Sequence, residues 1–176
     1  MSDAPDLRQS RWTVKRISIL VIFIALSAVG SLIKIPSVVG AVALDSCPGF
    51  FSALAFGYLE GAIVIAIGHL LSAVIVGFPM TIPIHLGAAT CMAIIAVVFR
   101  FISIKLAIGK RGIVGLVVAV IVGTLLNSFG GGLMALPLGG WGLYIALIPS
   151  LLVASAVNTA IAAIAFFSIR DSKLLR

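Results

Sequence analysis

Long stretches without a charged side chain constrain this chain more than any other feature. No Asp, Glu, Lys or Arg occurs in the 39 residues between Glu60 and Arg100, or in the 58 residues between Arg111 and Arg170. A helix needs about 20 mostly apolar residues to cross the hydrocarbon core of a bilayer. Each of these lengths is therefore sufficient for two membrane spans, and we expect an integral membrane protein.

Composition supports this interpretation and limits the alternatives. Hydrophobic residues make up 62% of the chain and charged residues 10%, with a mean hydropathy of +1.31, which lies outside the usual range of soluble domains. The 176 residues are enough for one compact bundle of helices. They leave no polar remainder from which a soluble catalytic domain could be built. The two cysteines do not indicate a disulfide framework.

The breaks inside the uncharged lengths predict where spans begin and end. Residues 17–33 form one span, and the two longer lengths are divided at "GFPMTIP" (77–83) and at "GGGLMALPLGGWG" (130–142), because Gly and Pro interrupt helices. The segment "PGFFSALAFGYL" after Cys47 provides only about 12 residues, roughly 18 Å of helix. We therefore expect a short or interrupted second helix.

The distribution of Lys and Arg predicts the orientation. With six spans, eleven of the twelve basic residues lie on the side of the two termini, and only Lys34 lies on the other side. Basic residues gather in cytoplasmic loops, so we predict an all-α integral membrane bundle of six transmembrane helices with both termini in the cytoplasm. Its parts are a basic N-terminal segment (1–16), a membrane domain (17–170) and a tail (171–176). Orientation and anionic lipid explain the net charge of +7, so no nucleic-acid partner is expected.

Polar side chains inside the spans are candidates for function, because such groups are costly in a bilayer unless they are paired or face a cavity. His69 and His85 lie on consecutive spans, and Asn127 and Asn158 lie in the similar motifs "TLLNS" and "SAVNT" of the last two spans. Two interpretations remain open for these groups. They could bind a solute, or they could only form hydrogen bonds between neighbouring helices.

Asp45 is the only acidic residue between Asp6 and Glu60. It lies within a Pro- and Gly-rich segment, residues 34–60, and irregular backbone at membrane depth occurs where it is buried in protein or lines a cavity. We therefore expect Asp45 to contact a ligand. The alternative is a helix cap, since Asp45 or Ser46 precedes Cys47 and Pro48.

Aromatic side chains are expected to gather at the same outer face. These are Phe50, Phe51, Phe78, Trp141 and Tyr144. Tyr144 fits an interfacial aromatic belt. Trp141 lies between glycines, and we expect it in an outer loop, as a lid that stacks on a flat ligand.

The sequence provides little basis for enzyme chemistry. It contains no Ser/His/Asp set, no H-E-x-x-H motif and no P-loop. The two histidines are 16 residues apart without a carboxylate at metal-ligand spacing. We expect no catalytic residues, no metal and no cofactor, and any phosphate-binding or ATP-hydrolysing machinery must come from elsewhere.

The run "IALSAVGSLIKIPS...ALDSCPGF...GHLLSAVIVGFPMTIPIH", over residues 24–85, resembles the substrate-binding S components of energy-coupling factor (ECF) transporters, which import vitamins. Within that family, "ALDS-x-PG", "GHLLSA" and "GFP...P-x-H" look most like the α-ribazole transporter group, which salvages a precursor of cobalamin. The resemblance implies a multi-pass protein of a bacterial or archaeal cell membrane. Its pocket would lie near the outer side, and its partners would be a transmembrane coupling (T) protein and two cytoplasmic ATPases.

The resemblance also implies two sets of functional residues. In the family, an Ala-x-x-x-Ala pattern on the first span packs on the coupling protein, whereas here two alanines lie three apart and two serines four apart: Ala25, Ser27, Ala28 and Ser31. The flat dimethylbenzimidazole and the ribose of α-ribazole would require apolar walls and polar groups, for which the expected set is Asp45, Ser46, Phe50, His69, Phe78, His85, Asn127, Trp141 and Asn158. Alternatives are an S component for cobalamin, pantothenate or riboflavin, and more remotely an intramembrane enzyme or a stand-alone carrier.

Overall fold

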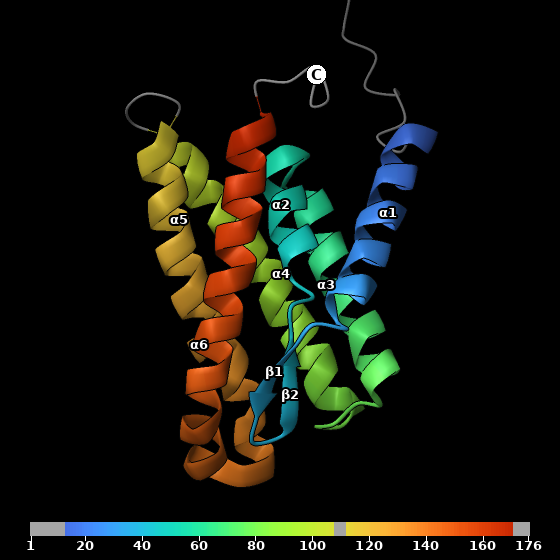
Figure 1. Cartoon of the computed structure of the whole chain (residues 1–176), viewed down its shortest axis with the longest axis vertical. Helices are drawn as coiled ribbons and strands as arrows, with labels where there is room; N and C mark the ends of the chain where they lie inside the picture. Colours follow the sequence, from blue (N-terminus) through green and yellow to red (C-terminus); the bar gives the residue numbers. More distant parts are fainter. Residues whose placement is uncertain (1–12, 108–111, 171–176) are drawn as a thin grey trace, which may run out of the picture.

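A computed structural model of the chain describes residues 13–107 and 112–170, which are mostly helical (Figure 1). In chain order the elements are α1 (Val14–Gly30), β1 (Lys34–Ser37), β2 (Gly40–Ala43), α2 (Cys47–Ala55), α3 (Tyr58–Val76), α4 (Ile82–Lys105), α5 (Ile113–Leu125), the π-helical turn η2 (Leu126–Gly130), the 3₁₀ turn η3 (Leu133–Ala135) and α6 (Leu136–Ile169). The predicted segment 171–176 and most of 1–16 lie outside the described residues.

Glycine and proline produce the first predicted break in the helices. α3 ends at Val76, and Gly77 follows with a φ of +87°, a left-handed conformation that glycine adopts without strain. α4 then begins at Ile82 with Pro83 in its first turn. The break expected at residues 77–83 is therefore confirmed.

The second predicted break takes a more helical form than expected. After α5 ends at Leu125, the chain continues through the π turn and the 3₁₀ turn directly into α6. Non-helical backbone angles occur only later, at Gly139 and Gly140. In the lower part of Figure 1 this segment bends around the end of the molecule. The chain does reverse between residues 130 and 142, but mostly through coiled backbone.

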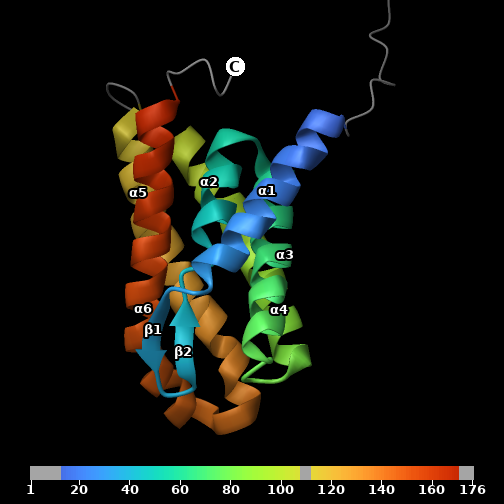
Figure 2. The same ribbon diagram turned by 45° about the vertical axis from the view of Figure 1, so that its right-hand side comes forward.

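Three helical segments of the described residues are long and apolar enough to cross a membrane: Tyr58–Val76, Ile82–Lys105 and the continuous run Ile113–Ile169. The second helix is short, as predicted, with nine residues. The start of α1 and the end of α6 lie at the same end of the molecule (Figures 1 and 2). The count of six spans and the cytoplasmic side of the termini stay predictions.

Close packing of α2 against α3 depends on glycine. A Cβ atom on Gly49 would lie 2.4 Å from the Cβ of Ile65, and one on Gly61 would lie 2.4 Å from the Cβ of Ala53. Helices in lipid gain little from the hydrophobic effect, so they associate through such close contacts between small residues. Phe50 of α2 then packs in the core against Phe99 of α4, with ring centroids 4.9 Å apart.

Ionic and hydrogen-bonded contacts join the helices at the end of the molecule where α1 begins. Arg100 of α4 donates hydrogen bonds to the carbonyl oxygens of Ala53 and Leu54, in the last turn of α2, the second at 2.7 Å. Nearby, Arg16 of α1 forms an ion pair with Glu60 of α3. The carbonyls at a helix end lack partners within the helix, so Arg100 supplies a cap from another helix.

Sequence analysis missed a β-hairpin between α1 and α2. β1 and β2 pair antiparallel, with Lys34 opposite Ala43 and Ser37 opposite Gly40. The hairpin lies beside α6, in the half of the molecule opposite the start of α1 (Figure 2). Four-residue strands without clear alternation of polar and apolar residues leave little periodic signal in a sequence.

Candidate functional site

A cavity of about 140 Å³ lies in the half of the molecule that holds the hairpin. It is lined by β2, the start of α2, the second half of α3, the start of α4, the π turn and the middle of α6. Its lining is mostly apolar, and the polar side chains are those of Asp45, Ser46, His69, Ser72, His85, Asn127, Ser155 and Asn158. Six of these residues belong to the set expected from the sequence.

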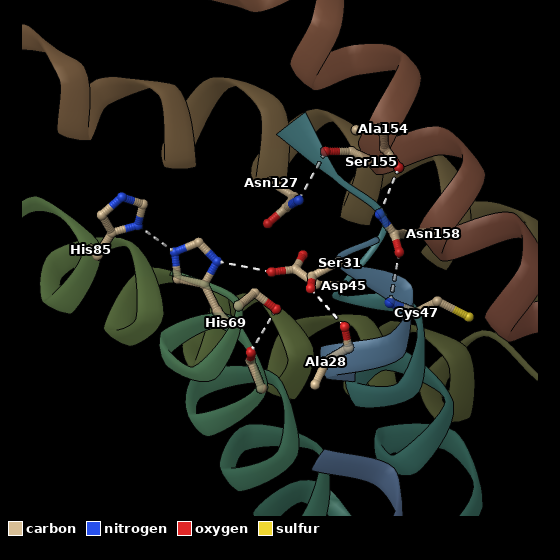
Figure 3. Close-up of polar contacts among 12 residues, drawn as sticks. Ala28, Ser31, Asp45, Cys47, His69, His85, Asn127, Ala154, Ser155 and Asn158 are labelled. Atoms are coloured by element: carbon tan, nitrogen blue, oxygen red, sulfur yellow. Dashed lines mark hydrogen bonds and ion pairs between the residues drawn. The ribbon is translucent and has the colours of Figure 1, made fainter. Parts of the chain in front are cut away.

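Asp45, His69 and His85 form a continuous polar chain (Figure 3). Asp45 is 6% exposed, and its Oδ2 lies 3.3 Å from Nδ1 of His69. Nε2 of His69 lies 3.2 Å from Nδ1 of His85. Nε2 of His85 is buried and has no hydrogen-bond partner among the described residues. This polar chain therefore connects a buried carboxylate, in the segment between β2 and α2, to an unpaired imidazole nitrogen of α4 through His69 of α3.

The start of α2 is held by Asn158 rather than by an acidic cap. The N-cap residue Ser46 makes no side-chain capping bond, and the N–H of Cys47 donates to Oδ1 of Asn158 at 2.7 Å. Nδ2 of Asn158 donates to the carbonyl of Ala154 at 2.9 Å. Ser46 therefore occupies the expected N-cap position, but the expected side-chain cap is not formed by Ser46, because Asn158 of α6 satisfies the first amide of α2.

Asn127 lies in the π turn that follows α5. Its Nδ2 donates to Oγ of Ser155 at 2.8 Å, while its Oδ1 is buried without a partner among the described residues. In Figure 3 this oxygen points away from Ser155, toward the space beside Asp45 and His69. π turns are frequent at functional sites, and this one carries an amide that is only half satisfied.

Hydrogen bonds between α6 and the end of α5 account for part of the two similar polar motifs. Thr124 and Thr159 are joined by a hydrogen bond of 2.9 Å between their hydroxyl oxygens. With the bond from Asn127 to Ser155, they form a ladder between the helices. Both open interpretations therefore apply: the two threonines bond to each other between helices and lie outside the cavity lining, whereas Asn127 and Asn158 also line the cavity.

The three aromatic residues of the expected set lie outside the cavity lining. Phe50 is completely buried in the core. Phe78 contacts the edge of the site, with its ring 5.6 Å from that of His85. Trp141 is 65% exposed and pairs with Tyr144. The loop predicted around Trp141 is wrong: this residue lies within α6, just after the kink at Gly139 and Gly140.

The small residues expected to dock on a partner point in different directions. Ser27 and Ser31 are completely buried within the chain, and a Cβ on Gly68 of α3 would lie 2.5 Å from Oγ of Ser27. Ala28 is half-buried and Ala25 is exposed. Packing within the chain therefore accounts for both serines, whereas Ala25 belongs to the outward face of α1.

Several apolar residues of the lining were not expected from the sequence. They are Val39, Val42 and Ala43 of the hairpin, Val76 and Met80 near the end of α3, Met92 of α4, and Leu147 and Leu151 of α6. No signal in the sequence separates them from the many other aliphatic residues, because lipid and a ligand cavity favour the same side chains.

The fold and this site define a class of protein: a helical membrane protein with a small, partly polar cavity enclosed between its helices. Residues 15–170 match the family model described as "ECF transporter, substrate-specific component", so the chain belongs to this family of S components. The expected family is thereby confirmed. It implies a small-molecule substrate and partnership with T and ATPase modules rather than catalysis.

A solved structure supports the fold. The chain is similar to the protein described in "Structure and mechanism of the S component of a bacterial ECF transporter", with 21% identity and a TM-score of 0.59. The match covers 89% of this chain and 93% of that chain. Comparison with curated proteins gives no significant match.

Proposed function

We propose that this S component captures α-ribazole from outside a bacterial or archaeal cell for ATP-driven uptake. The observation that carries this proposal is the character of the cavity, which combines aliphatic walls with a few buried polar groups that lack partners. α-Ribazole has a flat apolar base and a ribose with several hydroxyls. Ligand sites commonly match such molecules with apolar lining and a small number of placed polar groups.

The charge of the cavity favours a neutral ligand. Among the described residues, the lining includes the carboxylate of Asp45 but neither Lys nor Arg. An anion placed there would face a like charge in a medium of low dielectric constant, which costs energy. Pantothenate carries a carboxylate, so this argument disfavours it. The ribose of α-ribazole carries no charged group, so it would not be repelled by the carboxylate of Asp45.

The size of the cavity counts against the largest of the alternatives. A volume of about 140 Å³ is small for a ligand site, since pockets for drug-sized molecules occupy roughly 300–1,000 Å³. A whole cobalamin, with its corrin ring and attached nucleotide, would need a much larger space. Riboflavin is neutral and flat, so it remains the competitor that an experiment must exclude.

The outward face of α1 is the proposed surface for the coupling protein. Ala25 is exposed on this face, between exposed Val21 and Val29 one turn away on either side. A small residue in such a stripe lets another helix approach closely in lipid. The proposed complex contains a transmembrane T protein and two cytoplasmic ATPases, as the resemblance implies.

A thermal-shift screen of the purified protein in detergent tests the substrate. A ligand that binds only the folded state stabilises it by about 2.7 kcal/mol at 100 times its Kd. We expect a clear increase in melting temperature with α-ribazole, and none with pantothenate or cobalamin. The matched control is α-ribazole 5′-phosphate, which differs by one charged group and should bind much more weakly. A shift with riboflavin and none with α-ribazole would retain the family and reject the substrate.

A further inference from the structure

The carboxylate of Asp45 determines which nitrogen of each imidazole in the polar chain carries the proton. An ionised carboxylate only accepts hydrogen bonds, so Oδ2 of Asp45 requires a proton on Nδ1 of His69. A neutral imidazole with its proton on Nδ1 has a lone pair on Nε2. That lone pair faces Nδ1 of His85 at 3.2 Å, so His85 must carry its own proton on Nδ1.

The same logic leaves a lone pair on His85, at the far end of the polar chain from Asp45. With its proton on Nδ1, neutral His85 has an acceptor at Nε2, which is buried and unpaired among the described residues. Oδ1 of Asn127 is a second unpaired acceptor of the lining. The other polar atom of that amide, Nδ2, donates its hydrogen bond to Oγ of Ser155. Two acceptors from different helices therefore lack donors, and buried polar groups without partners are costly.

We propose that Asp45 holds both imidazoles in the Nδ1–H form, so that His85 Nε2 and Asn127 Oδ1 together select ligands by their hydrogen-bond donors. Asp45 is in this respect a positioning residue that acts through His69. The ligand to be selected carries hydroxyl or N–H groups at these two points. The part that concerns the ligand rests on the proposed function, whereas the part that concerns the imidazoles does not.

The chain offers a direct test, because His69 and His85 are its only histidines. The full-length protein, purified through a tag without histidine and labelled with ¹⁵N in histidine, should show two imidazoles in a ¹H–¹⁵N correlation spectrum at pH 8. We expect the protonated nitrogen of both rings to be Nδ1. Free histidine in water favours Nε2–H, so this pattern would report the influence of Asp45. A ring with Nε2–H, or with both nitrogens protonated, would overturn the proposal.

Two acidic residues of equal burial provide a test variant and a control variant. Asp45→Ala removes the acceptor, and both rings should change to a substantial Nε2–H population. Glu60→Gln changes the other acid that is 6% exposed, at the opposite end of the molecule, and should leave both rings as in the wild type. Equal spectra for Asp45→Ala and the wild type would refute the role of Asp45. If Asp45→Ala does not fold, the wild-type spectrum still decides whether the Nδ1–H forms exist.

Ligand analogues test the selection of donors. The 2′-, 3′- and 5′-O-methyl ethers of α-ribazole each keep the oxygen but lose one donor, so at least one should bind about tenfold more weakly than α-ribazole. Equal affinity of all three ethers and the parent would reject donor selection. If α-ribazole itself fails to bind while both rings are Nδ1–H, the proposed function fails and the positioning role of Asp45 stands.

Discussion

Asn158 gives the sharpest test of how the cavity is built into the fold. Its Oδ1 is the only acceptor that the described residues offer to the N–H of Cys47, at the start of α2. Asn158 is 1% exposed, and α2 begins inside the bundle, away from both ends (Figure 1). Asn158→Leu, which replaces the amide by an aliphatic group of similar size, would leave this N–H without a partner.

The magnitude follows from that one unpaired group. An unsatisfied buried donor costs about 1–3 kcal/mol. The second bond of Asn158, to the carbonyl of Ala154, should matter less because this oxygen can still accept the ordinary bond of the helix. We therefore expect Asn158→Leu to lower the free energy of unfolding by about 2 kcal/mol, a factor of about 30 in the folded-to-unfolded ratio.

Asn127→Leu is the matched control, since it makes the same chemical change at a neighbouring position of the cavity. Asn127 bonds only a serine hydroxyl and carries an oxygen that is already unpaired, so no backbone group loses its partner. Its stability should change by less than about 1 kcal/mol, whereas its affinity for α-ribazole should decrease. Equilibrium unfolding of the ligand-free protein in mixed micelles measures both variants. If Asn127→Leu is as destabilising as Asn158→Leu, the satisfaction of Cys47 does not explain the role of Asn158.

Two further predictions concern the other faces of the molecule. Ala25→Trp should abolish ATP-driven uptake in membranes that contain the complete transporter while ligand binding by the isolated protein is retained. The control Ala156→Trp, at an exposed alanine of α6, should transport normally, and equal transport by both variants would exclude this docking face. Arg100→Met should cost about 1.5–3 kcal/mol, because charged hydrogen bonds to the last carbonyls of α2 are lost. Lys105→Met, at the exposed end of the same helix, should change stability by much less, and a comparable loss in both variants would contradict a specific cap.

Local chemistry made part of the site predictable. His69, His85 and the two asparagines are conspicuous because polar side chains are rare and costly in membrane spans, and Asp45 because it is the lone acid of an irregular segment; all five line the cavity. The short second helix and the break at Gly77 were predictable for a similar reason, since chain length and glycine act through the backbone alone. These inferences needed no knowledge of which helices are neighbours.

Contacts between distant segments were not predictable in this way. The pairing of Cys47 with Asn158 joins residues 111 positions apart, and nothing near Cys47 indicates that its amide needs an acceptor from α6. The side-chain cap expected from Ser46 is not formed for this reason. Likewise, the glycines that flank Trp141 indicate a loop, whereas this residue lies within α6 and only Gly139 and Gly140 before it have non-helical angles.

The sequence by itself determined that this chain is a membrane protein, where its main helices end and which side chains are too polar for lipid. Those properties depend on transfer free energies and backbone preferences, which each residue carries with it. Only the tertiary structure decided that Asp45, His69 and His85 form one chain, that Ser27 faces inward, and that the aromatic residues lie outside the cavity. The physical reason is that lipid and protein interior are similarly apolar, so hydrophobicity does not tell a helix which face to bury. That choice is made by close packing at glycines such as Gly49 and Gly68 and by hydrogen bonds between helices.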